Sequence, residues 1–333
     1  MNQVNEIVET IKNGNPKPIY FLMGEESYYI DKISDFIENN VLKEEERGFN
    51  QVVLYGRDVS VEEIISQAKR FPMMAEKTVV IVKEAQELSR TIEKLVSYVE
   101  NYQPSTVLVL NYKYKTLDKR KKLNKLISKA GIVFESKKLY DNQVADWIRK
   151  VLNGRNYQME PKAAQMLVEF LGTSLSKISN ELDKLTLVLP EGSIINPNHI
   201  EENIGISKDF NNFELRKAVG NRNILKANQI INYFSNNPKN NPLVMTISLL
   251  NSYFTQLLVY HGLKDKSKMN VAKSLGVSPY FVNDYVVASR SYPMRKVSLI
   301  IGFLREADLK SKGVGASISQ NDLLKELLFK IMH

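Results

Sequence analysis

The chain has 333 residues, which is enough for two or three domains that each bury a core. Apolar residues make up 43% of it and charged residues 25%, as in ordinary globular proteins, and we expect no membrane-spanning helix because no apolar run approaches the roughly 20 residues that one needs. Cysteine is absent, which excludes disulfides and thiolate metal sites, and the net charge of +9 suits a protein that works near nucleic acid.

Histidine usage and the N-terminal sequence exclude two further classes. His199, His261 and His333 are scattered without the spacing of a zinc site or a catalytic triad, so we expect no metal, no cofactor and no histidine-centred catalysis. The first residues, MNQVNEIVETIKNG, have neither the basic start nor the cleavage site of a signal peptide. Together with the lack of cysteine, this predicts a cytoplasmic protein.

Strand-like and helix-like segments alternate over residues 1–139. The strand candidates are short and apolar, as strands buried on both faces should be: residues 19–23, 52–55, 78–82, 106–110 and 132–135. Between them, apolar residues recur at helical spacing, including a stripe over residues 88–99, and Ser60 and Glu63 form a capping box. This alternation predicts a parallel, doubly wound α/β domain.

The first strand and helix have the layout of a phosphate-binding loop without its chemistry. Counting from Gly24, the Gly-Lys-Ser/Thr of such a loop would fall at residues 29–31, whose side chains cannot do this work. Glu25 and Glu26 stand where phosphate oxygens would lie and would repel ATP. The third strand ends in Lys83, a cation where a metal-binding carboxylate is needed. We therefore predict a degenerate nucleotide site with no hydrolytic centre.

After residue 139 we expect helices only. A first group, ending near residue 207, covers residues 144–152, 161–171, 174–187 and a short helix capped by Asn196 and Pro197. Longer helices follow at residues 223–235, 242–263, 279–291, 294–312 and 320–332. The predicted domains are an α/β domain at 1–139, a small helical domain at 140–207 and a C-terminal helical domain at 208–333.

The sequence AKRFPMMAEKTVVIV, residues 68–82, contains an unusual turn. Pro72 ends a helix, and consecutive methionines follow where turns normally use Gly, Asn, Asp or Ser. One interpretation is that Met73 and Met74 fill the core beneath the helix. The other is that Phe71, Pro72, Met73 and Met74 form an apolar plug for a partner's pocket. Burying two methionines would contribute roughly 3–6 kcal/mol, enough for a binding hot spot.

Residues 113–129 are strongly basic. We regard Lys119, Arg120, Lys121 and Lys122 as candidate DNA-contacting residues, because basic residues on a helix can follow a phosphate backbone and nearby tyrosines can stack on bases. The alternative is an ordinary solvated helix face.

Residues 270–286, NVAKSLGVSPYFVNDYV, imitate a helix-turn-helix. Ala272, Gly276, Val282 and Val286 have suitable spacing. The second helix offers mostly aromatic and acidic side chains, a poor set for reading the major groove, so ordinary packing of two helices is the competing interpretation. A helix-turn-helix DNA-binding regulator is therefore the alternative function.

Several motifs together resemble the delta subunit family of the bacterial DNA polymerase III clamp loader. In chain order they are FLMGEESYYID, FPMMAEKTVVIV, SLSKISNELDKL, NNFELRKAV, VAKSLGVSPYFV and ADLKSKG. Each motif is weak alone, but six in the family's order, spread over nearly the whole chain, are specific. The turn departs from the usual pattern, since methionines replace Leu or Phe and Ala75 replaces Gly.

The resemblance implies an AAA+-like α/β domain without a working ATP site, a small helical lid and a C-terminal helical collar. It implies that Met73 and Met74 enter the hydrophobic pocket of the ring-shaped sliding clamp, the beta subunit, and favour its open form. The implied partners are this clamp, the ATPase gamma/tau and delta-prime type subunits through the collar, and primed DNA. The chain would have no catalytic site of its own while serving a holoenzyme that is a DNA-directed DNA polymerase.

Overall fold

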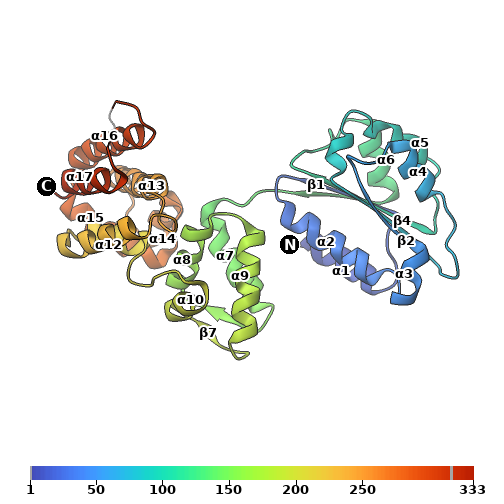
Figure 1. Cartoon of the computed structure of the whole chain (residues 1–333), viewed down its shortest axis with the longest axis horizontal. Coiled ribbons are helices and arrows are strands. Elements are labelled where there is room, and N and C mark those ends of the chain that lie inside the picture. The colour runs from blue at the N-terminus through green and yellow to red at the C-terminus, as the bar shows by residue number, and fades with distance from the viewer. Residues whose placement is uncertain (1, 316–317) are drawn as a thin grey trace. The chain divides into compact units, whose positions relative to one another are not determined.

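The computed structural model describes residues 2–315 and 318–333, which form two compact units, Met1–Leu139 and Tyr140–His333. The first unit contains helices and strands in alternation (Figure 1). They are α1 (Asn2–Lys12), β1 (Ile19–Gly24), α2 (Ser27–Asn40), α3 (Glu44–Asn50), β2 (Gln51–Tyr55), α4 (Val61–Ala68), β3 (Thr78–Lys83), the 3-10 helices η1 (Ala85–Leu88) and η2 (Ile92–Leu95), α5 (Val96–Val99), β4 (Thr106–Lys113), α6 (Lys122–Ala130) and β5 (Ile132–Ser136).

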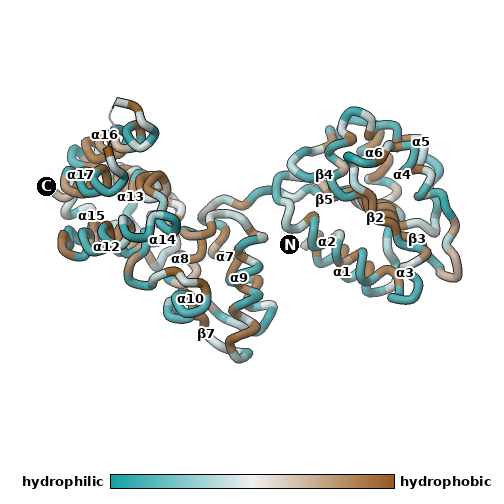
Figure 2. The backbone as a smooth tube through the Cα atoms, in the orientation of Figure 1, coloured by the Kyte–Doolittle hydropathy of each residue, from teal (hydrophilic) through white to brown (hydrophobic). Residues whose placement is uncertain are grey.

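The strands of the first unit form one parallel sheet in the order β2-β3-β4-β1-β5. Alternate strand residues point to opposite faces, so Phe21 of β1 joins a core with α4, α5 and α6, while Tyr20 joins a core with α1 and α2. Helices thus cover both faces, and the strands are the most hydrophobic segments of the unit (Figures 1 and 2). The predicted parallel, doubly wound sheet is confirmed.

Two details of the first unit differ from expectation. Helices α1 and α3 were not predicted. The stripe over residues 88–99 forms η1, η2 and α5 instead of one helix. The interruption falls at Thr91, whose backbone N–H and hydroxyl both donate to the Leu88 carbonyl, at 2.9 and 3.3 Å, and so satisfy it locally.

The second unit is almost entirely helical. Its elements are α7 (Asp141–Asn153), β6 (Gln158–Met159), α8 (Pro161–Leu171), α9 (Leu175–Val188), β7 (Ile194–Ile195), α10 (Pro197–Ile204), α11 (Asn212–Gly220), α12 (Ile224–Asn236), α13 (Leu243–Gly262), α14 (Lys268–Leu275), the 3-10 helix η3 (Pro279–Phe281), α15 (Val282–Ser291), α16 (Met294–Ser311) and α17 (Gln320–Met332). The expectation of helices only is wrong for β6 and β7, which pair in parallel. Strands of two residues are too short to show a period. The further division at residue 207 stays a prediction.

Helix α13 corrects another expectation. Among the described residues it is the one helix long and apolar enough to cross a membrane by length and composition. One face of it, including Leu250, Phe254 and Leu257, is buried in the core that α13 forms with α16 and its neighbours. These are the contacts of a core helix, and a core helix passes the same test of composition.

Candidate functional site

Residues 70–77, here called the apolar turn, lie between α4 and β3 without regular structure. Three large apolar side chains of this turn face solvent: Phe71 is 78% exposed, Met73 56% and Met74 101%. The interpretation of the methionines as core filler is therefore wrong. Large apolar side chains gathered on one loop are unusual, because scattered single residues are the norm for a protein surface.

Contacts on both sides hold the ends of the apolar turn. Before it, the Ala68 carbonyl at the end of α4 accepts from the Thr106 hydroxyl (2.8 Å) and the Tyr98 hydroxyl (3.3 Å). After it, the Lys77 ammonium donates to the Pro104 carbonyl (3.1 Å), and β3 begins in register with β4. The turn is thus a short loop between fixed ends.

Asn50, the last residue of α3, holds the middle of the apolar turn. Its side chain is buried and pairs with the backbone of Met73 on both sides: the Met73 N–H donates to Oδ1 (2.6 Å) and Nδ2 donates to the Met73 carbonyl (2.9 Å). Met74 then has a left-handed backbone conformation with φ of 54°, which residues other than glycine rarely adopt. Asn50 was not predicted, because nothing local in the sequence links it to a turn 23 residues away.

Two backbone N–H groups of the loop at Gly24 donate to backbone carbonyls of neighbouring segments in the same unit. The Gly24 N–H donates to the Lys115 carbonyl (3.1 Å) and the Glu26 N–H to the Ser136 carbonyl (3.4 Å). The Glu26 carboxylate accepts from the Tyr28 N–H (3.0 Å) at the start of α2. A phosphate site needs these N–H groups free. Burial raises the pKa of Glu26, and its bond to Tyr28 and the charge of Lys138 only partly offset this.

Ion pairs occupy the edge of the sheet where a metal would assist a nucleotide. Lys83 at the end of β3 pairs with Glu38 (3.3 Å), and Lys113 at the end of β4 pairs with Asp31 (2.6 Å). Burial raises the pKa of Asp35, on the same helix, α2. Over residues 2–315 and 318–333, no group of three or more acidic or histidine side chains is placed to hold a metal ion.

The candidate DNA-contacting residues lie at the start of α6, and all four have acidic partners. Lys119, Arg120 and Lys121 precede the helix, and Lys122 is its first residue, so the expected helix contains only the last of them. The pairs are Lys119–Glu135 (2.9 Å), Arg120–Asp118 (2.8 Å), Lys121–Glu93 (3.4 Å) and Lys122–Glu100 (2.6 Å). Hydrogen bonds from Arg120 lower the pKa of Asp118 to about 2. All four cations are exposed.

The segment that resembles a helix-turn-helix, residues 270–286, is formed by α14, η3 and the first half of α15. Ala272 and Val282 are buried in the core of the second unit, and Gly276 ends α14 with φ of 67°. On α15, Tyr285 is also buried, and its hydroxyl donates to the Gln256 side chain (2.6 Å). These contacts are those of ordinary helix packing.

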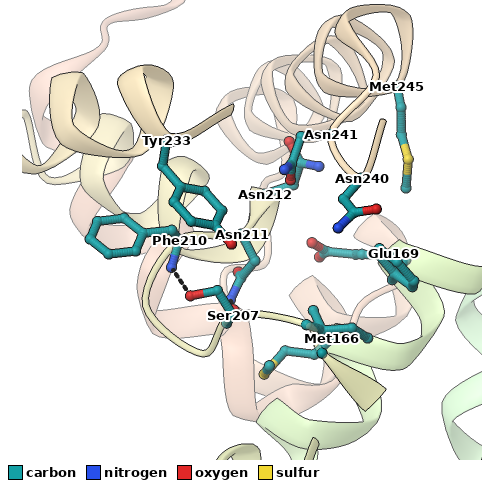
Figure 3. A pocket seen from close by; sticks show the side chains of 13 residues that line it. Met166, Glu169, Ser207, Phe210, Asn211, Asn212, Tyr233, Asn240, Asn241 and Met245 are labelled. Atoms are coloured by element: carbon teal, nitrogen blue, oxygen red, sulfur yellow. Dashed lines mark hydrogen bonds between the residues drawn. The ribbon is translucent and has the colours of Figure 1, made fainter. Parts of the chain in front are cut away.

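A pocket in the second unit lies beside α8, α12 and the start of α13 (Figure 3). The Glu169 carboxylate points into it, accepts from the Gln165 side chain (2.8 Å) and forms an ion pair with Arg216. Asparagine side chains from residues 211, 212, 240 and 241 and the stacked rings of Phe210 and Tyr233 complete its wall. No residue predicted as a site residue lines it.

Comparisons with known proteins point in one direction. The model of "DNA polymerase III, delta subunit" matches residues 20–137, and the model of that subunit's C-terminal domain matches residues 209–330. The DNA polymerase III subunit delta of Bacillus subtilis is 26% identical over 320 residues, which cover 93% of this chain and 92% of that protein. The probable DNA polymerase III subunit delta of Aquifex aeolicus is 22% identical over 280 residues, covering 79% of this chain and 77% of that one.

A solved structure also resembles this chain along its length. The Bacillus subtilis DNA clamp loader delta protein has a TM-score of 0.58 and 26% identity, with 99% of each chain covered. The predicted resemblance is therefore confirmed. The predicted fold class of a parallel α/β domain followed by helices is confirmed as well.

Proposed function

Because the chain belongs to the family of DNA polymerase III delta subunits, we propose that it binds and opens the sliding clamp within the clamp loader without hydrolysing ATP itself. The observation that carries this proposal is the apolar turn, with Phe71, Met73 and Met74 exposed on a short loop between fixed ends. These side chains have the chemistry of a plug for another protein's apolar pocket.

Such a plug could supply enough binding free energy to act as a hot spot. Burying Met73 and Met74 contributes roughly 3–6 kcal/mol, from which the rotamer entropy of two flexible side chains must be subtracted. Asn50 reduces the entropic cost of ordering the backbone of the turn on binding, because it already holds the Met73 backbone in the free chain. The apolar turn is therefore preorganised at its backbone and adaptable at its side chains.

The loop at Gly24 supports the second part of the proposal. Its N–H groups bond to the Lys115 and Ser136 carbonyls, and the buried Glu26 carboxylate caps α2 where a phosphate would bind. ATP would have to displace these bonds and overcome repulsion from Glu26. We infer that ATP binding and hydrolysis belong to neighbouring loader subunits and control when the apolar turn is exposed.

Clamp opening would follow from differential affinity. A ligand shifts an equilibrium between two states only as far as it binds one of them more tightly. The apolar turn would therefore have to bind the open form of one clamp interface better than the closed form, so that the ring spends more time open and admits DNA.

The further partners in this proposal follow from the family. The C-terminal helical domain, residues 208–333, would join gamma/tau and delta-prime type subunits in the loader, and the residues around Lys119–Lys122 would face primed DNA. Clamp loading would take place in the cytoplasm, where the chromosome is replicated.

A double variant tests the proposal. The Met73→Ala/Met74→Ala chain should bind the sliding clamp of its own organism at least tenfold more weakly, measured by titration and size-exclusion chromatography. Because both side chains are exposed, its melting temperature should stay close to that of the wild type. Leu187→Ala/Val188→Ala, which removes another adjacent pair of exposed apolar side chains, is the matched control. Unchanged clamp binding by the methionine variant would refute the site.

A further inference from the structure

A further exposed apolar residue, Phe49, lies on α3, the helix whose last residue contacts the apolar turn. Phe49 of α3 is 72% exposed, and the residue after it, Asn50, is the one whose side chain pairs with the Met73 backbone. Phe49 is 24 residues from Met73 in sequence, but it directly precedes Asn50, the residue that makes this contact. No sequence pattern connects Phe49 with Met73, since α3 itself was not predicted.

The sheet fixes this neighbourhood. Gln51 of β2 is in register with Val79 of β3, and both strands run in the same direction. The end of α3 and the apolar turn therefore enter neighbouring strands at the same edge of the sheet. The hydrogen bonds between Asn50 and Met73 place the end of α3 beside the loop that leads into β3.

Phe49 has no part in the core of its unit. Asn50 is the buried residue of α3, while the first turn of the helix carries Glu44, Glu45 and Glu46. The helix is held instead by polar contacts, including the Arg47 guanidinium, which donates to the Asn39 carbonyl (2.7 Å). An aromatic ring that is mostly exposed on an otherwise polar helix contributes little to folding, whereas aromatic rings are enriched at binding hot spots.

We propose that Phe49 is part of the clamp-binding surface, so that α3 and the apolar turn dock together on the sliding clamp with Phe49, Phe71, Met73 and Met74 as the apolar contacts. This inference rests on the proposed function. The clamp would receive a two-segment surface, and Asn50 would fix the spacing between the segments. Phe49 directly precedes Asn50, and Asn50 is hydrogen-bonded to the Met73 backbone, so the two exposed segments are tied through one buried amide, which supports a single partner.

Substitution of Phe49 tests the inference on the full chain and the clamp of the same organism. Phe49→Ala should weaken clamp binding by about tenfold, whereas Phe49→Leu, which keeps an apolar side chain, should retain most of the affinity. Tyr114→Ala is the matched control, because Tyr114 is an equally exposed aromatic residue that follows β4 at the opposite edge of the sheet. It should bind the clamp like the wild type.

The outcomes separate this inference from the proposed function. If Phe49→Ala binds like the wild type while Met73→Ala/Met74→Ala is weakened, Phe49 lies outside the interface and the inference fails alone. If the methionine variant also binds normally, the proposed function fails with it. Equal weakening by Phe49→Ala and Tyr114→Ala would show a general loss of surface aromatics, which also overturns the inference.

Discussion

Asn50 pairs with Met73 as a neighbouring β-strand would, giving an acceptor to its N–H at 2.6 Å and a donor to its carbonyl at 2.9 Å. The same Nδ2 also donates to the Glu46 carbonyl at 2.9 Å, so one buried amide joins α3 to the apolar turn. The exposed part of the proposed plug therefore depends on a buried polar contact, and plug geometry and local stability should change together.

Removing this amide should reduce both clamp affinity and stability. In Asn50→Ala the backbone groups of Met73 lose their partners, so we expect the free energy of unfolding to fall by about 1–3 kcal/mol. We also expect clamp binding to weaken about three- to tenfold, because the turn must then be ordered on binding. Denaturant titration and clamp titration measure the two effects.

Asn40→Ala is the control for this variant, because the Asn40 side chain donates to the Phe36 carbonyl (2.8 Å) within its own helix, α2. A loss of stability in Asn50→Ala with full clamp affinity would mean that the turn keeps its shape without the amide.

The buried carboxyl of Glu26 should make stability depend on pH. Burial raises the pKa of Glu26 in the folded chain above its unfolded value, so the unfolded chain loses this proton first as the pH rises. Between these two pKa values the folded state binds more protons, and stability falls with rising pH. Glu26→Gln keeps an acceptor for the Tyr28 N–H and removes the charge.

The melting temperature of Glu26→Gln should therefore exceed that of the wild type at pH 7, and this difference should shrink as the pH is lowered to 4. Measuring the difference cancels the titration of other carboxylates. A difference that stays constant over this range would show that ionisation of Glu26 does not limit stability.

Much of the fold was predictable from local pattern. Strands buried on both faces read as continuous apolar runs, so β3 was located to within one residue by the sequence TVVIV. The start of α4 was equally clear, because Ser60 and Glu63 exchange the hydrogen bonds of a capping box. Three of the missed elements have weak local signals, since β6 and β7 have two residues each and α3 is a short polar helix. Helix α1 was also missed, although Val4, Ile7 and Ile11 recur at helical spacing.

The site was only half predictable. The residues Phe71, Pro72, Met73 and Met74 are unusual for a turn, but their composition fits burial and exposure equally well. Exposure is decided by the fixed ends of the turn and by Asn50, which are contacts between segments far apart in the chain. The same holds for Phe49, whose position beside the turn follows from the register of β2 with β3. Sequence pattern carries no information about such pairings.

The residues around the start of α6 allow a test of DNA contact. Lys119, Arg120, Lys121 and Lys122 each pair with a carboxylate, but exposed ion pairs contribute only about 0–1 kcal/mol, so phosphates can compete for these cations. In a reconstituted loader, changing all four to Gln should weaken binding of primed DNA and reduce the slope of log K against log salt by up to about 3–4. Fluorescence anisotropy at several salt concentrations measures both.

Lys12→Gln/Lys94→Gln is the control. These two exposed lysines have glutamate partners in the same unit, and their substitution should leave the slope unchanged. An unaltered slope in the fourfold variant would instead identify this segment as a solvated, ion-paired surface.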